Sequence, residues 1–392
     1  MTAYDLLITG GTVIDPASGL HDRRDVGIVD GRIVAVAAGL STSDARDVVD
    51  ATDRFVVPGL VDLHVHVYPG VADLSVEADP TCLGRGVTTV VDAGSSGANT
   101  FPGFRRHVVE ASRGRVLAYL NISATGQIDP FLGELHDLRF ADPERAAAVA
   151  RAHPDVVVGF KVRISEMLAG PNGLAGLDRA LEAGRATGLP VMVHIGGTSF
   201  DIEEALDRLR PDDVVTHAYT GWNPGGILTD AGRVVAAARE ARTRGVRFDV
   251  GHGAGSFTWR TAEAALADGF RPDTISSDLH RFNIATPVHD LATTLSKFLL
   301  LGLSIDDVVA MATTAPAGAL GPAGAGLASL AVGAAADVTI LGLEEGRFEL
   351  VDSAGTSRSA RQRLVPVATV RAGKSVPVLP LLTTPPVGIS PG

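Results

Sequence analysis

Six side chains able to bind a metal ion stand at the ends of short apolar runs: His64, His66, Lys161, His194, His217 and Asp278. The first two form a His-x-His pair, and the period of two along a strand places both imidazoles on one face, where they can share a metal ion. Alone, this pair would fit two hydrogen-bonded histidines of a core. The whole set is hard to explain by packing, because burying unpaired imidazoles and carboxylates is costly. It therefore indicates a pocket that binds metal ions or performs catalysis.

The lysine of this set needs its own explanation, since the chain has only two others, Lys297 and Lys374. Coulomb repulsion disfavours an ammonium group next to divalent cations. Lys161 therefore lies outside the pocket, pairs with a carboxylate, or reacts with CO₂, which converts its amine into a carboxylate that can bridge two metal ions. The sequence leaves these alternatives open.

The middle of the chain alternates apolar runs with Ala-, Arg- and Glu-rich stretches of helical spacing. Eight runs occur, at 60–66, 87–92, 115–122, 156–161, 191–194, 213–217, 246–250 and 274–278. The alternation predicts an α/β fold, and the count favours a (β/α)₈ TIM barrel over a doubly wound open sheet, which would give the same alternation. The carboxyl ends of barrel strands face one mouth, so the six side chains are expected to converge there.

Both ends of the chain consist of short β-rich runs with tight turns. Asp30-Gly31 is a strong hairpin signal, and short strands are expected at 336–341, 348–352 and 365–370. We predict a small split β-sandwich domain from 1–57 and 331–379, a catalytic barrel over 58–330 and a C-terminal surface tail over 380–392.

The composition of the chain limits the cellular compartments and the classes of partner that can be expected. A net charge of −11 with scattered arginines argues against nucleic acid or an anionic membrane as partner. No apolar stretch is long enough to span a bilayer, and the first residues lack the pattern of a signal peptide. The single cysteine, Cys82, excludes an intrachain disulfide. These features predict a cytoplasmic protein that acts on a small molecule.

The candidate ligands resemble those of the binuclear-metal branch of the amidohydrolase superfamily in their order and in their placement on the strands. They are the segment Val61-Asp-Leu-His-Val-His66 and the residues Lys161, His194, His217 and Asp278. The β domain split between both chain ends is also typical of that superfamily. Further segments, at 161–165, 248–257, 277–280 and 313–317, are similar to the deacetylase-like amidohydrolases. Dihydroorotases usually carry an arginine two places after the second histidine, where this chain has Tyr68.

The resemblance implies a set of roles for these residues. His64, His66 and Asp278 would hold one divalent metal ion, His194 and His217 the other, and carboxylated Lys161 would bridge them together with a hydroxide. Zn²⁺ suits such ligands best. Asp278 would act as the catalytic residue that moves the proton to the leaving group.

The implied activity is hydrolysis of an amide or ester bond in a small polar substrate, in the manner of a deacetylase. The rivals are a cyclic-amide hydrolase of dihydroorotase or hydantoinase type and a non-catalytic barrel. A homo-oligomer is an expectation from the resemblance. No Gly-x-Ser-x-Gly occurs, so the usual elbow of a serine hydrolase is absent from the sequence.

Four more residues are weaker candidates for substrate contacts: Arg163, Tyr68, His252 and His280. Arg163 follows Lys161 by two and would share its side of the strand, where it could bind an acidic group or form an ion pair at the rim. Asp62 could hydrogen-bond a metal ligand, or make only a strand-end contact.

Overall fold

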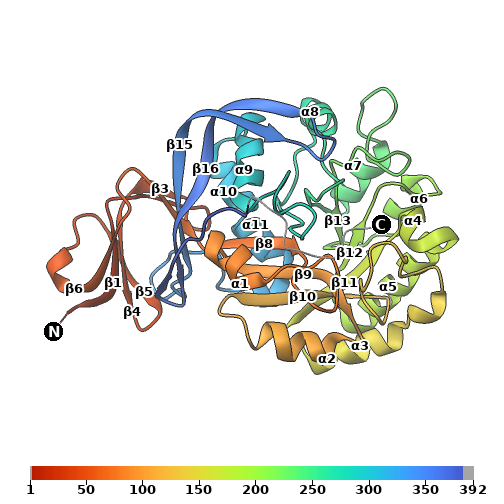
Figure 1. Cartoon of the computed structure of the whole chain (residues 1–392), viewed down its shortest axis with the longest axis horizontal. Helices are drawn as coiled ribbons and strands as arrows, with labels where there is room; N and C mark the ends of the chain where they lie inside the picture. Colours follow the sequence, from red (N-terminus) through yellow and green to blue (C-terminus); the bar gives the residue numbers. More distant parts are fainter. Residues whose placement is uncertain (1, 383–392) are drawn as a thin grey trace.

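The computed structural model describes residues 2–382, and its centre is a curled parallel sheet of seven strands paired in chain order (Figure 1). The strands are β8 (Leu60–Val65), β9 (Val87–Gly97), β10 (Arg115–Asn121), β11 (Val157–Arg163), β12 (Val191–His194), β13 (Val214–Thr216) and β14 (Arg247–Phe248). They match seven of the expected runs. The sheet belongs to a (β/α)₈ TIM barrel, which confirms the predicted fold class.

The eighth apolar run, 274–278, is not a regular strand, which corrects the expectation for this segment. It nevertheless bonds to both neighbours: Val250 N donates to Thr274 O at 3.1 Å, and Asp278 N donates to His64 O at 2.7 Å. Asp278 has a φ of 49°, and this left-handed conformation interrupts extended pairing. The eighth segment therefore joins the last strand to the first through isolated contacts.

Short helices connect and cover the strands: α1 (Ala78–Thr81), α2 (Phe101–Phe104), α3 (Pro143–Ala152), α4 (Glu166–Ala169), α5 (Gly173–Thr187), α6 (Ile202–Leu206), α7 (Ala236–Thr243), α8 (Trp259–Ala267), α9 (Leu291–Leu300), α10 (Ile305–Met311) and α11 (Thr314–Ala319). Local signals explain their limits. Helix α3 begins at Pro143 after Asp142, whose side chain accepts from Arg145 N. Helix α5 ends at Thr187 and is followed by Gly188, which takes the left-handed conformation.

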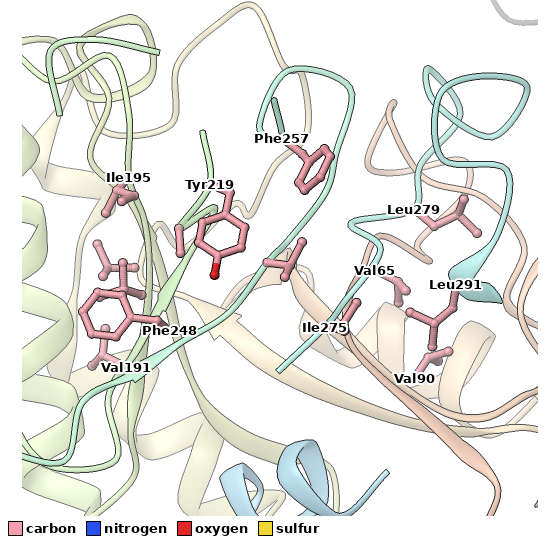
Figure 2. Close-up of a cluster of buried hydrophobic side chains, with 14 of the residues drawn as sticks. Val65, Val90, Val191, Ile195, Tyr219, Phe248, Phe257, Ile275, Leu279 and Leu291 are labelled. Atoms are coloured by element: carbon pink, nitrogen blue, oxygen red, sulfur yellow. The ribbon is translucent and has the colours of Figure 1, made fainter. Parts of the chain in front are cut away.

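The barrel has two apolar layers. Val61, Leu63, Tyr119 and Met192 belong to a cluster that also includes residues of β9, β11 and β13. A larger cluster packs the strands against the surrounding helices. Figure 2 shows part of it, with Val65 of β8, Val191 of β12, Phe248 of β14, Ile275 of the eighth segment and Leu291 of α9.

The chain ends form two further sheets. The first has the order β5-β4-β1-β6, from β1 (Tyr4–Thr9), β4 (Asp25–Val29), β5 (Arg32–Ala37) and β6 (Ala45–Asp50). The second has the order β17-β16-β15-β7-β2-β3, from β2 (Thr12–Asp15), β3 (Leu20–Arg23), β7 (Phe55–Pro58), β15 (Val338–Val351), β16 (Ser357–Arg371) and β17 (Lys374–Val376). Val56 pairs with Ile340, which joins the two ends. The predicted domain limits stay a prediction, and most of the predicted tail, 383–392, lies outside the described residues.

Strands β15 and β16 form one long hairpin, where the sequence predicts short separate strands. Pairing continues across the exposed, charged segment Glu344-Glu345-Gly346-Arg347, with a register shift between Glu345 and Phe348. The hairpin extends over the barrel toward α8 and α9 (Figure 1). At its turn, Asp352 Oδ2 accepts from Trp259 N at 3.0 Å. Within residues 2–382, no helix has both the length and the apolar character needed to cross a membrane.

Candidate metal centre

The six predicted ligands converge on one cavity of about 150 Å³ at the carboxyl ends of the strands. His64 Nε2 and His66 Nε2 lie 3.3 and 3.1 Å from Asp278 Oδ1. The His194 and His217 rings are 4.2 Å apart between centroids. His194 is half-buried, and the other five are buried. The rest of the lining consists of Leu74, Gln127, Pro130, Arg163, Ser256, His280 and Phe282.

Two of these side chains stand on backbone that non-glycine residues rarely adopt. His217 has a φ of 69° and Asp278 a φ of 49°. Such a conformation costs about 1–3 kcal/mol and persists where the surroundings hold it, often at functional sites. Asp278 is held at both backbone ends: its N–H donates to His64 O at 2.7 Å, and its carbonyl accepts from Asn283 Nδ2 at 2.7 Å.

The donor atoms in the cavity fit a divalent cation. His217 Nδ1 lies 2.7 Å from Gly251 O; a carbonyl only accepts, so Nδ1 carries the proton and Nε2 of the neutral ring has a free lone pair. Burial lowers the pKa of His66 to about 3 and that of His217 to about 4, which keeps both neutral near pH 7. Asp278 Oδ1 is buried without a hydrogen-bond partner within residues 2–382.

Ligand atoms of His64, His217 and Asp278 all lie within 4.8 Å of one another. A buried carboxylate oxygen surrounded by imidazole nitrogens is costly unless a cation neutralises it. Imidazole and carboxylate ligands suit Zn²⁺ and related divalent ions.

Lys161 enters the same cavity from β11. It is fully buried, and its Nζ lies 3.4 Å from His64 Nε2. Its stem packs against Gly94, where an added Cβ would come within 2.7 Å of Lys161 Cγ. Burial lowers the pKa of Lys161 to about 7, with Arg163 acting in the same direction and Asp278 opposing it. Near neutral pH much of the amine is therefore uncharged, which is the nucleophilic form.

The weaker candidates divide into two pairs. His280 and Arg163 line the cavity, and burial lowers the pKa of His280 to about 4. Arg163 is also ion-paired: its Nε donates to Glu134 Oε1 at 2.7 Å, and its Nη2 donates to Glu134 Oε2. The ion pair that the sequence left open as an alternative for Arg163 is therefore present, with both side chains buried.

Tyr68 and His252 are not among the residues that line the cavity, and their predicted substrate contacts stay a prediction. The Tyr68 hydroxyl donates to Thr100 O at 3.0 Å, and its ring packs on Phe104. His252 Nε2 lies 2.6 Å from Lys297 Nζ. Thr100 and Phe104 therefore hold the Tyr68 side chain, and Lys297 of α9 holds the His252 ring.

Asp62 hydrogen-bonds a candidate ligand through the backbone: its Oδ1 accepts from His64 N at 3.4 Å. Its carboxylate also accepts from Ser277 N at 3.0 Å and from Ser277 Oγ at 2.5 Å. Burial raises the pKa of Asp62 to about 7. Sequence reasoning missed Gln127, Glu134, Ser256 and Phe282, which lie in loops without periodicity. No signal in a single sequence singles them out.

The chain is similar to known proteins over most of its length. Residues 55–376 match the model of the amidohydrolase family. A protein named deacetylase from Agrobacterium fabrum is 37% identical over 327 residues, which cover 83% of this chain and 80% of the relative. A crystal structure described as an adenine deaminase superposes with a TM-score of 0.88 at 32% identity, covering 95% of this chain and all of the other (100%). One described as a dihydroorotase gives 0.87 at 33% identity, covering 95% and 99%. The chain belongs to the amidohydrolase family.

Proposed function

We propose that the cavity holds two divalent metal ions, preferentially Zn²⁺, and that the protein hydrolyses an amide or ester bond of a small polar substrate in the manner of a deacetylase. The observation that carries this proposal is Asp278 Oδ1, a buried acceptor without a partner in the described chain that faces the Nε2 atoms of His64 and His66. The name of the Agrobacterium relative supports the deacetylase class.

In this proposal His64, His66 and Asp278 hold one ion and His194 and His217 the other. Lys161, once carboxylated by CO₂, would supply a further carboxylate ligand to both ions. The lowered pKa of Lys161 supports this modification, because only the neutral amine attacks CO₂. When bound, the two cations would supply an activated water and polarise the substrate carbonyl.

The remaining chemistry belongs to the protein. Asp278 takes a proton from the attacking water and delivers it to the leaving group. Arg163 binds an acidic group of the substrate, since Glu134 occupies only its Nε and Nη2. The cavity, about 150 Å³ in volume, suits a small acyl group.

The rival that an observation favours is a cyclic-amide hydrolase, because the solved structure described as a dihydroorotase is similar over nearly the whole chain. A panel separates the two. Protein loaded with zinc and bicarbonate is assayed on N-acyl amino acids, O-acyl hydroxy acids, dihydroorotate, hydantoins and lactams, with adenine included. Turnover of the acyl substrates is expected. Turnover of ring substrates alone would overturn the deacetylase assignment, and no bound metal with no turnover would indicate a non-catalytic barrel.

A further inference from the structure

A buried carboxylate that the proposed reaction does not use lies in the barrel, at Asp249 directly after β14. Three hydroxyl groups donate to it. Thr216 Oγ1 and Ser276 Oγ are 2.8 and 2.6 Å from its Oδ2, and Thr274 Oγ1 is 2.6 Å from its Oδ1. All four residues are at most 1% exposed. Burial raises the pKa of Asp249, and the three hydroxyls oppose that effect.

One of the three hydroxyls also touches a predicted metal ligand. Thr216 Oγ1 lies 2.9 Å from His64 Nδ1. A hydroxyl carries a single proton, and the proton of Thr216 is directed at Asp249. The Thr216 oxygen can therefore only accept from His64, so Nδ1 must carry a proton.

The protonation state of His64 follows from this count. A neutral imidazole has one N–H, and in His64 that hydrogen is directed at Thr216 Oγ1. With that hydrogen on Nδ1, Nε2 keeps a free lone pair. Nε2 is the atom in the cavity, 3.3 Å from Asp278 Oδ1 and 3.4 Å from Lys161 Nζ.

We propose that Asp249 and Thr216 are positioning residues that fix the tautomer of His64, so that its Nε2 is permanently available to a cation. This inference rests on the proposed metal-binding function. Asp249 acts at a distance by setting the direction of the Thr216 hydroxyl, which in turn sets the position of the imidazole proton.

The chain offers a matched pair of variants for the test. Thr216→Val and Thr274→Val each remove one buried hydroxyl from Asp249, but only Thr216 reaches His64. Metal-free proteins are titrated with Zn²⁺ in bicarbonate by calorimetry. Thr216→Val is expected to weaken zinc binding about 10- to 100-fold, the usual loss when the partner of a metal-binding histidine is removed.

Two conservative changes complete the set. Thr274→Val is expected to stay within about threefold of the wild type, because it leaves the Thr216 hydroxyl in place. Thr216→Ser restores the hydroxyl and should recover wild-type affinity. Asp249→Asn lets an amide N–H donate to Thr216, which permits the reversed hydroxyl direction and should weaken binding as Thr216→Val does.

The outcomes separate the two proposals. If the wild-type protein binds no zinc, the proposed function fails. If it binds zinc and Thr216→Val binds equally well, or Thr274→Val loses as much affinity as Thr216→Val, only the positioning role is rejected. As a readout independent of metal, ¹⁵N NMR of the metal-free protein, assigned by loss of the His64 signals in His64→Asn, should show the proton of His64 on Nδ1. A proton on Nε2 would overturn the inference.

Discussion

Replacing Lys161 with methionine is expected to stabilise the metal-free protein while reducing its response to metal. The side chain is fully buried, and its pKa falls from the ordinary 10.5 to about 7. Between these two values the unfolded chain binds a proton that the folded chain does not, so the stability of the wild type rises with pH across this window. Methionine is of similar length, and its uncharged stem can keep the contact with Gly94.

The size of the effect follows from the same window. At pH 7.5 the wild type gives up a proton on folding at a cost of about 4 kcal/mol, and at pH 9.5 the cost is only about 1 kcal/mol. Lys161→Met has no amine to deprotonate on folding, so this cost is absent from the variant. Its advantage in the free energy of unfolding should therefore shrink from about 4 to about 1 kcal/mol over these two pH units.

Urea unfolding of chelator-treated proteins, followed by tryptophan fluorescence at both pH values, measures this difference. Lys374→Met is the control, because Lys374 is an exposed lysine at the start of β17. Added Zn²⁺ and bicarbonate should stabilise the wild type by about 3–4 kcal/mol at roughly 100 to 1,000 times the dissociation constant, and Lys161→Met much less. If Lys161→Met is no more stable at pH 7.5, the buried-amine reasoning is wrong. An advantage that stays constant with pH would assign the gain to packing.

Three further predictions concern the same cavity. The pKa of His217 is lowered from 6.5 to about 4 in the folded protein, so the free energy of unfolding of the metal-free protein should fall by about 3 kcal/mol between pH 6.5 and pH 4. In His217→Asn the urea midpoint should depend less on pH across this range. A pH dependence equal to that of the wild type would contradict this prediction. Asp278→Asn should lower kcat by about 10²- to 10⁴-fold in the zinc-loaded enzyme, and a loss below tenfold would exclude proton transfer by Asp278. Glu134→Gln leaves the buried Arg163 without its charged partner and should lower the free energy of unfolding by about 3–5 kcal/mol, measured in urea. The double variant with Arg163→Met should recover part of that stability. A loss below about 1 kcal/mol in Glu134→Gln would show that the ion pair is well hydrated.

Local patterns were sufficient to predict the barrel and the place of the candidate ligands. Barrel strands such as β8, β11 and β12 are buried on both sides, so each appears in the sequence as an apolar run, and the residue that ends the run marks the mouth. His64, Lys161 and His194 were placed in this way, and the structure brings them to one cavity. Their roles as metal ligands stay a prediction.

The surroundings of each side chain were decided only by the tertiary structure, because they depend on contacts between segments distant in sequence. Arg163 meets Glu134 across 29 residues, and Thr216 meets His64 across 152. His252 belongs to a run similar to the deacetylase-like proteins, yet its ring faces Lys297 of α9 rather than the cavity. A strand pattern specifies where a side chain leaves the backbone; which partner its polar atom finds depends on how loops and helices pack around the barrel mouth, and these carry no periodic signal.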